Sequence, residues 1–178
     1  MPILSWQEGQ TIKNVRKMVL SSLFAALTAV CAWISIPLPP LAFTLQSFSL
    51  LLCLGLLGGK WGTVTMGLYL CLGILGLPVF SGFQGSAALL GPTGGFLWGF
   101  FLGGLVYWCM ERLGILPAMI AAQLVCYLCG CGWFSVYAGG SGLTAAVLTC
   151  VVPYLVPDAL KLGLAYTLTK RIGKRITI

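Results

Sequence analysis

Three long blocks without a single charged residue constrain this chain more than any other feature. The charge-free blocks are residues 18–59, 61–110 and 113–157. Lys60 separates the first two blocks, and Glu111 with Arg112 separates the second from the third. Each block is about twice the roughly 20 apolar residues that a helix needs to cross a bilayer. Each block therefore predicts a helical hairpin in a membrane.

The composition supports a membrane location. Of the 178 residues, 59% are apolar and 7% are charged, whereas soluble domains carry about 25% charged residues. So much apolar surface would aggregate in water, so the lipid bilayer is the expected solvent. The chain is too short for two sizeable domains, and residues 1–178 are interpreted as one integral-membrane domain.

The basic residues predict the orientation of the chain. They flank the first and the last apolar runs: Lys13, Arg16, Lys17, Lys170, Arg171, Lys174 and Arg175. Cytoplasmic segments next to membrane spans are enriched in Lys and Arg, so both termini are expected in the cytoplasm. Residues 1–17 form a basic cytoplasmic N-terminus ahead of a retained first span. These charges are interpreted as topology signals and not as a nucleic-acid site.

The predicted fold class is an all-α polytopic membrane protein of the cell membrane. Six transmembrane helices form three hairpins, which returns the chain to the side on which it starts. The expected spans are 18–36, 44–59, 61–77, 94–110, 115–137 and 155–172.

The outer turns carry glycine and proline but no charge. They are residues 36–46, 76–95 and 137–142. Uncharged, non-helical backbone at membrane depth is tolerated where protein buries it or where it lines a cavity. The long second turn is therefore expected to fold inward over a pocket. Pro153 and Pro157 interrupt the last block, so residues 143–151 are expected to form a short helix before the last span.

The sequence offers little for catalysis or for metal binding. It has no histidine, and its carboxylates are Glu8, Glu111 and Asp158. Three cysteines, at positions 126, 129 and 131, resemble a metal motif but have no apparent fourth ligand, and buried cysteines are commonly small hydrophobes. The stretch around Lys60 lacks a phosphate-binding loop, because Trp61 stands where that loop needs Ser or Thr. The protein is not expected to be an enzyme or to hold a cofactor or metal, and any ATP hydrolysis must come from partners.

Asp158 is the only aspartate, and Lys161 follows one helical turn later in an apolar stretch. A spacing of three places both side chains on one helix face. A self-satisfied ion pair would explain them, but ionisable residues in membrane segments usually serve a function. The second interpretation is that both charges meet a polar ligand near the outer face.

Four stretches resemble one known family. They are TLQSFSLLLCLGLLG, YLCLGILGLPVF, GPTGGFLWGF and VVPYLVPDALKLGLA. Together they resemble the BioY family, the biotin-specific membrane subunit (S component) of energy-coupling factor (ECF) vitamin transporters. The resemblance runs from about Ala42 to Lys170.

The resemblance implies a function in vitamin uptake. The subunit would capture biotin at the outer face and deliver it inward with an ECF transmembrane coupling subunit and a cytoplasmic ATPase pair. The first helix of such subunits carries small residues that contact the coupling subunit, and Ser21, Ala25 and Ala29 fit that spacing. Ordinary packing inside the protein is the alternative explanation for these three residues.

The resemblance also implies ligand-binding residues. They are Asp158, Lys161, Gln46, Thr44, Phe43, Phe83, Gln84 and Thr93. Asp158 would accept from the ureido N–H groups of biotin, and Lys161 would pair with either the ureido oxygen or the carboxylate. The aromatic rings of Phe43 and Phe83 would cover the apolar ring system.

Two other functions fit the composition. A stand-alone secondary carrier or facilitator for biotin or a similar vitamin would use Asp158 as its coupling carboxylate. A structural membrane scaffold would bind no small molecule tightly.

Overall fold

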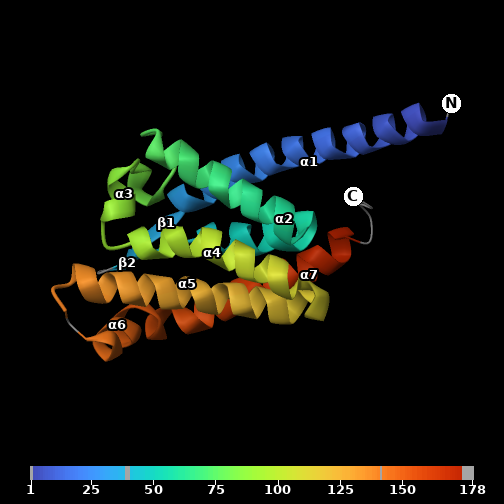
Figure 1. Ribbon diagram of the computed structural model, residues 1–178. Helices are drawn as coiled ribbons and strands as arrows, with labels where there is room; N and C mark the ends of the chain where they lie inside the picture. Colours follow the sequence, from blue (N-terminus) through green and yellow to red (C-terminus); the bar gives the residue numbers. More distant parts are fainter. Residues whose placement is uncertain (1, 39–40, 141, 174–178) are drawn as a thin grey trace.

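The computed structural model describes residues 2–38, 41–140 and 142–173, with side chains from Thr11 onward except those of residues 13, 37 and 38. Lys174 and Arg175 of the basic C-terminal cluster lie outside these ranges. Helices make up most of the chain (Figure 1). The α-helices are α1 (Pro2–Trp33), α2 (Gln46–Ile74), α3 (Ala87–Leu90), α4 (Gly94–Met110), α5 (Ile115–Tyr137), α6 (Leu143–Cys150) and α7 (Leu155–Gly173). Short 3₁₀ turns are η1 (Ser81–Phe83), η2 (Glu111–Leu113) and η3 (Val152–Tyr154).

Two strands interrupt the helical fold between α1 and α2. Strands β1 (Ser35–Leu38) and β2 (Leu41–Thr44) form an antiparallel hairpin, with Ser35 opposite Thr44. The sequence predicts only helices and a non-helical turn here, so an all-α description needs this correction. Pairing between the two strands satisfies part of the backbone hydrogen bonding, which backbone at membrane depth requires. As a result α1 ends at Trp33, three residues before the expected end of the first span.

Helix α2 is broken at Gly58, where φ is 79° and ψ is 167°. A residue with a Cβ is strained at this φ, so glycine suits the position. The chain reverses there, and the second limb packs against the first: a Cβ at Gly62 would lie 3.0 Å from the Cα of Leu54 (Figure 1). The freed backbone N–H of Gly59 donates to Oε2 of Glu111 at 2.7 Å. The charged turns at Lys60 and at Glu111–Arg112 therefore lie at the same end of the molecule.

Small residues let α4 and α5 lie side by side (Figure 1). Gly95, Gly99 and Gly103 repeat every four residues on α4 and face α5. A Cβ at Gly103 would lie 2.8 Å from the carbonyl oxygen of Ala122. This spacing is typical of closely packed helices in membranes. Helix α2 packs on α1, α4 and α7 and completes the core.

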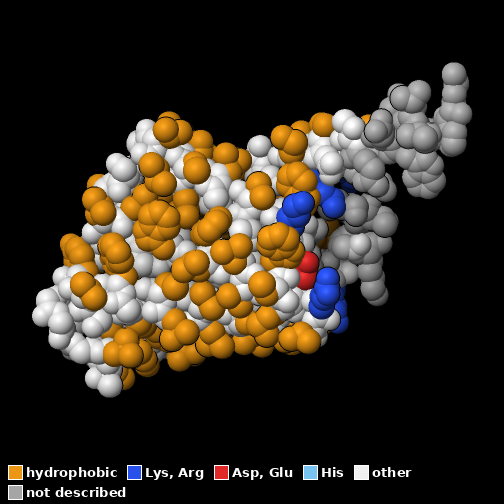
Figure 2. All heavy atoms as spheres, in the orientation of Figure 1, with side chains coloured by type: hydrophobic (Ala, Val, Ile, Leu, Met, Phe, Trp, Pro, Cys, Tyr) orange, Lys and Arg blue, Asp and Glu red, His pale blue; other side chains and the backbone are white. Residues whose placement is uncertain are grey.

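The two ends of the molecule differ in character. The hairpin, α3 and α6 gather at one end, and the chain termini lie at the other (Figure 1). Figure 2 shows Lys and Arg side chains and an acidic side chain near the terminal end and apolar side chains over the flank between the ends. The exposed apolar residues of the helices include Leu102, Leu124, Leu128, Leu160 and Leu164.

Four stretches in the described part of the chain are long and apolar enough to cross a membrane. They are Asn14–Trp33, Gln46–Ile74, Ile115–Tyr137 and Leu143–Gly173. The last stretch contains α6, η3 and α7. Helix α7 begins at Leu155, so Pro157 occupies its first turn, where a missing N–H costs no helical hydrogen bond.

Candidate functional site

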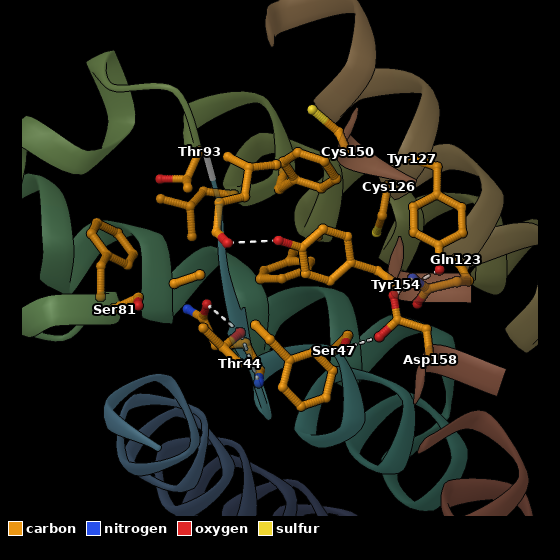
Figure 3. Close-up of a pocket in the computed structure, with 18 of the residues that line it drawn as sticks. Thr44, Ser47, Ser81, Thr93, Gln123, Cys126, Tyr127, Cys150, Tyr154 and Asp158 are labelled. Atoms are coloured by element: carbon orange, nitrogen blue, oxygen red, sulfur yellow. Dashed lines mark hydrogen bonds between the residues drawn. The ribbon is translucent and has the colours of Figure 1, made fainter. Parts of the chain in front are cut away.

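A pocket, partly open to the outside, lies toward the end formed by the hairpin, α3 and α6 (Figure 3). Its empty space is about 770 Å³, including open solvent at its mouth. Most elements of the fold contribute to it. Its lining comes from β2, the start of α2, the segment between α2 and α4, and helices α4 to α7. The pocket therefore joins parts of the chain more than 100 residues apart in sequence.

The charged residues in the pocket wall are Asp158 and Lys161 from the first turns of α7. Their side chains are buried, and Nζ of Lys161 lies 2.8 Å from Oδ1 of Asp158. Each ion stabilises the other, which reduces the cost of removing both from water. The first turn of α7 also places the carboxylate near the positive end of the helix dipole.

Asp158 accepts hydrogen bonds at both oxygens. The hydroxyl of Tyr127 donates to Oδ2 at 2.7 Å, and Nε2 of Gln123 donates to the same oxygen at 3.4 Å. The hydroxyl of Ser47 donates to Oδ1, also at 3.4 Å. Two of these contacts are long and therefore weak, so a ligand donor that replaces them would cost little.

Lys161 uses all three of its N–H donors within the protein. Besides Asp158, its Nζ donates to the carbonyl oxygen of Thr44 at 2.6 Å and to Oγ of Ser47 at 3.1 Å. The ammonium also lies 3.8 Å from the centre of the Phe43 ring, a cation–π contact. Lys161 thereby ties α7 to the hairpin and to the start of α2.

A chain of hydrogen bonds connects the hairpin to the segment between α2 and α4. The hydroxyl of Thr44 donates to Oε1 of Gln46, and Nε2 of Gln46 donates to the hydroxyl of Tyr69. Tyr69 in turn donates to the carbonyl oxygen of Val79 at 2.9 Å. Tyr69 also meets the ring of Phe80 edge to face. The position of this pocket wall is thus set through Gln46.

The rest of the pocket is largely apolar. Phe43 stacks with Tyr154 at 6.4 Å between ring centres, and Tyr154 donates to the carbonyl oxygen of Leu41 at 2.6 Å. Other apolar lining residues are Phe80, Phe96, Leu97, Phe100, Cys126 and Cys150. An apolar cavity with a few placed polar groups suits a small molecule that is part apolar and part polar.

The structure brings together six of the eight residues predicted to bind a ligand. Those that line the pocket are Asp158, Lys161, Gln46, Thr44, Phe43 and Thr93. Thr93 precedes α4, on the side of the pocket away from Asp158 (Figure 3).

Phe83 and Gln84 do not line the pocket, which corrects their predicted position. Gly82 and Phe83 both adopt positive φ in a tight turn, which directs the Phe83 ring outward. That residue is 65% exposed, and its ring lies 5.1 Å from the ring of Trp33. The backbone of Gln84 pairs with Phe80. Phe80 and Ser81 occupy the pocket wall instead.

Ser21, Ala25 and Ala29 were predicted to contact a partner subunit, with packing inside the protein as the alternative. All three are buried inside the protein on the face of α1 that packs against α2. On the same face, Oγ1 of Thr28 and Oγ of Ser49 are 2.9 Å apart in a hydrogen bond. The burial of these small residues favours the alternative of internal packing.

Five polar residues of the site were not predicted from the sequence: Ser47, Ser81, Gln123, Tyr127 and Tyr154. A signal for two of them exists, because Gln123 and Tyr127 are four residues apart on one helix face in an apolar run. Gln123 is the only amide side chain in residues 115–137.

The cysteines of α5 pack in the apolar interior. The thiol of Cys126 donates to the carbonyl oxygen of Gly99 at 3.2 Å. No group of three His, Cys, Asp or Glu side chains that could hold a metal ion occurs among the described residues.

Known proteins resemble this chain over nearly its whole length. Residues 6–177 match the model of the BioY family. Biotin transporter BioY of Thermotoga maritima is 37% identical over 166 residues, which cover 90% of this chain and 97% of that protein. Probable biotin transporter BioY of Pyrococcus horikoshii is 37% identical over 164 residues, covering 89% and 97%.

A solved structure has the same fold. It is a crystal structure of the S-component for biotin from an ECF-type ABC transporter, with a TM-score of 0.83. The likeness covers 91% of this chain and 93% of that one, at 24% sequence identity.

The buried ion pair generates a prediction about stability. Lys161→Met leaves Asp158 charged without its cation, and Asp158→Asn leaves Lys161 without its anion. Each change should lower the free energy of unfolding by about 3–5 kcal/mol, because an uncompensated buried charge is costly. The double variant should lose clearly less than the sum of the two. Denaturant unfolding in detergent measures all three, and additive losses would contradict an energetically coupled pair.

Proposed function

This chain belongs to the BioY family, and we propose that it is the biotin-binding membrane subunit of an ATP-driven vitamin uptake system. The observation that carries the proposal is the buried pair of Asp158 and Lys161 in the wall of a mostly apolar pocket. The names of the Thermotoga and Pyrococcus relatives support biotin as the cargo. Biotin is bound for transport here, with no cofactor or metal.

Biotin matches the chemistry of the pocket. Its ureido ring has two N–H donors and one carbonyl oxygen, its ring system and chain are apolar, and its tail is a carboxylate. Asp158 accepts from ureido N–H groups in place of its long contact with Ser47. Lys161 donates to an oxygen of biotin in place of Ser47. The apolar rings, including Phe43 and Phe80, cover the body of the ligand.

The proposed membrane topology has six spans in three hairpins. They are α1, the two limbs of α2 on either side of Gly58, α4, α5 and α7. The first limb of α2 has only about 12 residues and spans about 18 Å, which is shorter than the hydrocarbon core of about 30 Å. The β1–β2 hairpin therefore covers the rest of the membrane thickness at this span. The charged turns at Lys60 and Glu111 share one end with both termini, which supports a cytoplasmic location for that end.

The proposed partners are an ECF transmembrane coupling subunit and a cytoplasmic ATPase pair. The fold shared with the S-component of an ECF-type ABC transporter supports this assignment. The chain itself lacks a phosphate-binding loop at Lys60. Energy for uptake therefore comes from the partner ATPases.

The direct test of the site is a binding titration with biotin on purified protein in detergent. Wild-type protein should bind biotin tightly, and Lys161→Ala should weaken binding by at least about 100-fold, because a buried hydrogen bond from a charged donor is lost and Asp158 is left unpaired. Lys170→Ala is the matched control, since this exposed lysine lies on the same helix outside the pocket and should change nothing. Thermal unfolding of each variant checks that the fold is retained. Unchanged affinity in Lys161→Ala would remove this residue from the site.

The second test separates the subunit from a stand-alone carrier. Protein reconstituted alone in liposomes should bind biotin, hydrolyse no ATP and accumulate none of the vitamin. Addition of the coupling subunit, the ATPases and internal ATP should start uptake. Uptake by the protein alone would favour the carrier, and absence of any biotin binding would favour a scaffold.

The third test concerns topology. Green fluorescent protein fused after the C-terminus should fluoresce, because it folds in the cytoplasm, and alkaline phosphatase fused there should be inactive. Fusions after Gly139, in the predicted third outer turn, should give the opposite pattern. Active phosphatase at the C-terminus would refute the proposed orientation.

A further inference from the structure

Gln123 of α5 lies in the pocket wall next to Tyr127 and Asp158 (Figure 3). Its side chain is almost fully buried, with 8% of the residue exposed. None of the contacts assigned so far to ligand binding uses its carbonyl oxygen.

The orientation of this amide is set by its neighbour. Nε2 faces Oδ2 of Asp158 at 3.4 Å, and a carboxylate accepts hydrogen bonds but donates none, so the NH₂ group must face it. The amide oxygen is therefore turned to the other side. Within the described part of the chain, Oε1 of Gln123 has no hydrogen-bond partner. A buried acceptor without a donor is costly, so such a group in a native protein needs an explanation, and a donor on a bound ligand is one.

Gln123 differs from the other amide of the pocket and from the other unpaired buried polar atoms. Gln46, the other amide of the pocket, uses its oxygen with Thr44 and its nitrogen with Tyr69. The other buried side-chain atoms without a partner, among the described residues, are hydroxyls, Oγ of Ser21 and Oγ1 of Thr169, and neither residue lines the pocket. A hydroxyl can rotate to a carbonyl of its own helix, but the oxygen of Gln123 can only accept. Of the three residues, Gln123 alone lines the pocket.

We propose that Gln123 is a specificity-determining residue whose Oε1 accepts a hydrogen bond from a ring N–H of the bound ligand. This inference rests on the proposed function and names the group recognised: a cyclic urea, which carries N–H donors beside its carbonyl. Asp158 and Gln123 then offer acceptors on one wall of the pocket. A ligand whose ring nitrogens lack hydrogen would leave the oxygen of Gln123 unpaired and would bind weakly.

The experiment compares Gln123→Met, a change of similar length that removes both amide groups, with Leu128→Met at an exposed position of the same helix outside the pocket. Each protein is titrated with biotin and with two biotin derivatives, each methylated at one ureido nitrogen. Gln123→Met should weaken biotin binding by about 10-fold, the loss expected for one buried hydrogen bond. Leu128→Met should bind all three ligands as the wild type does.

The derivatives provide the readout that a purely structural role would not change. One derivative should bind the wild type much more weakly than biotin does. The ratio of the dissociation constants of this derivative and of biotin should be about 10-fold smaller in Gln123→Met than in the wild type. The melting temperature of the ligand-free variant should stay the same or rise, because an unpaired acceptor has been removed. Gln123→Leu serves as the second variant if the methionine variant does not fold.

The outcomes separate the inference from the proposed function. The role of Gln123 alone is overturned if the wild type binds biotin and Gln123→Met binds it with the same affinity. It is also overturned if methylation weakens binding to Gln123→Met as much as it weakens binding to the wild type, for both derivatives. Absence of biotin binding by the wild type overturns the proposed function and the inference together.

Discussion

The ion pair between Asp158 and Lys161 is the interaction on which the rest of the site depends. Neither residue could remain charged alone inside an apolar helix bundle, because removing one partner leaves a buried charge. Paired, they form a polar centre at the start of α7. Lys161 uses its remaining donors on the hairpin and on α2, and Asp158 draws in Tyr127 from α5. One pair of residues thus joins four parts of the fold around one cavity.

This arrangement explains how an apolar pocket can present charged groups to a polar ligand. Each strong hydrogen bond of the pair is short, and the weak ones, to Ser47 and Gln123, are 3.4 Å long. An incoming donor replaces the weak contact with Ser47, so the charges stay compensated before and after binding. The stacked rings of Phe43 and Tyr154 keep the hairpin over the pocket. Stability and binding therefore draw on the same residues.

The sequence predicted the helices and the ion pair well, since charge-free blocks and a spacing of three residues are local signals. Helices α4 and α5 have the expected bounds, 94–110 and 115–137. The hairpin was missed because prolines at positions 37, 39 and 40 hide its strand pattern. Phe83 was misplaced because a turn at Gly82 decides where its ring points. For Ser21, Ala25 and Ala29, small residues indicate close packing but do not say against what. Gln123 and Tyr154 were not predicted as site residues because only contacts between distant parts of the chain bring them to the pocket.

The reversal of the chain at Gly58 has a consequence for the length of α2. Gln46 and Tyr69 lie on opposite limbs, 23 residues apart, yet their side chains share a hydrogen bond. Each residue added to or removed from a helical limb rotates the remainder of that limb by about 100°. One inserted residue between these two positions would turn the phenol of Tyr69 away from the amide of Gln46. The hydrogen bonds that connect Gln46, Tyr69 and Val79 along this pocket wall would then be lost. The number of residues between Gln46 and Tyr69 is therefore as much a part of the pocket as the residues themselves.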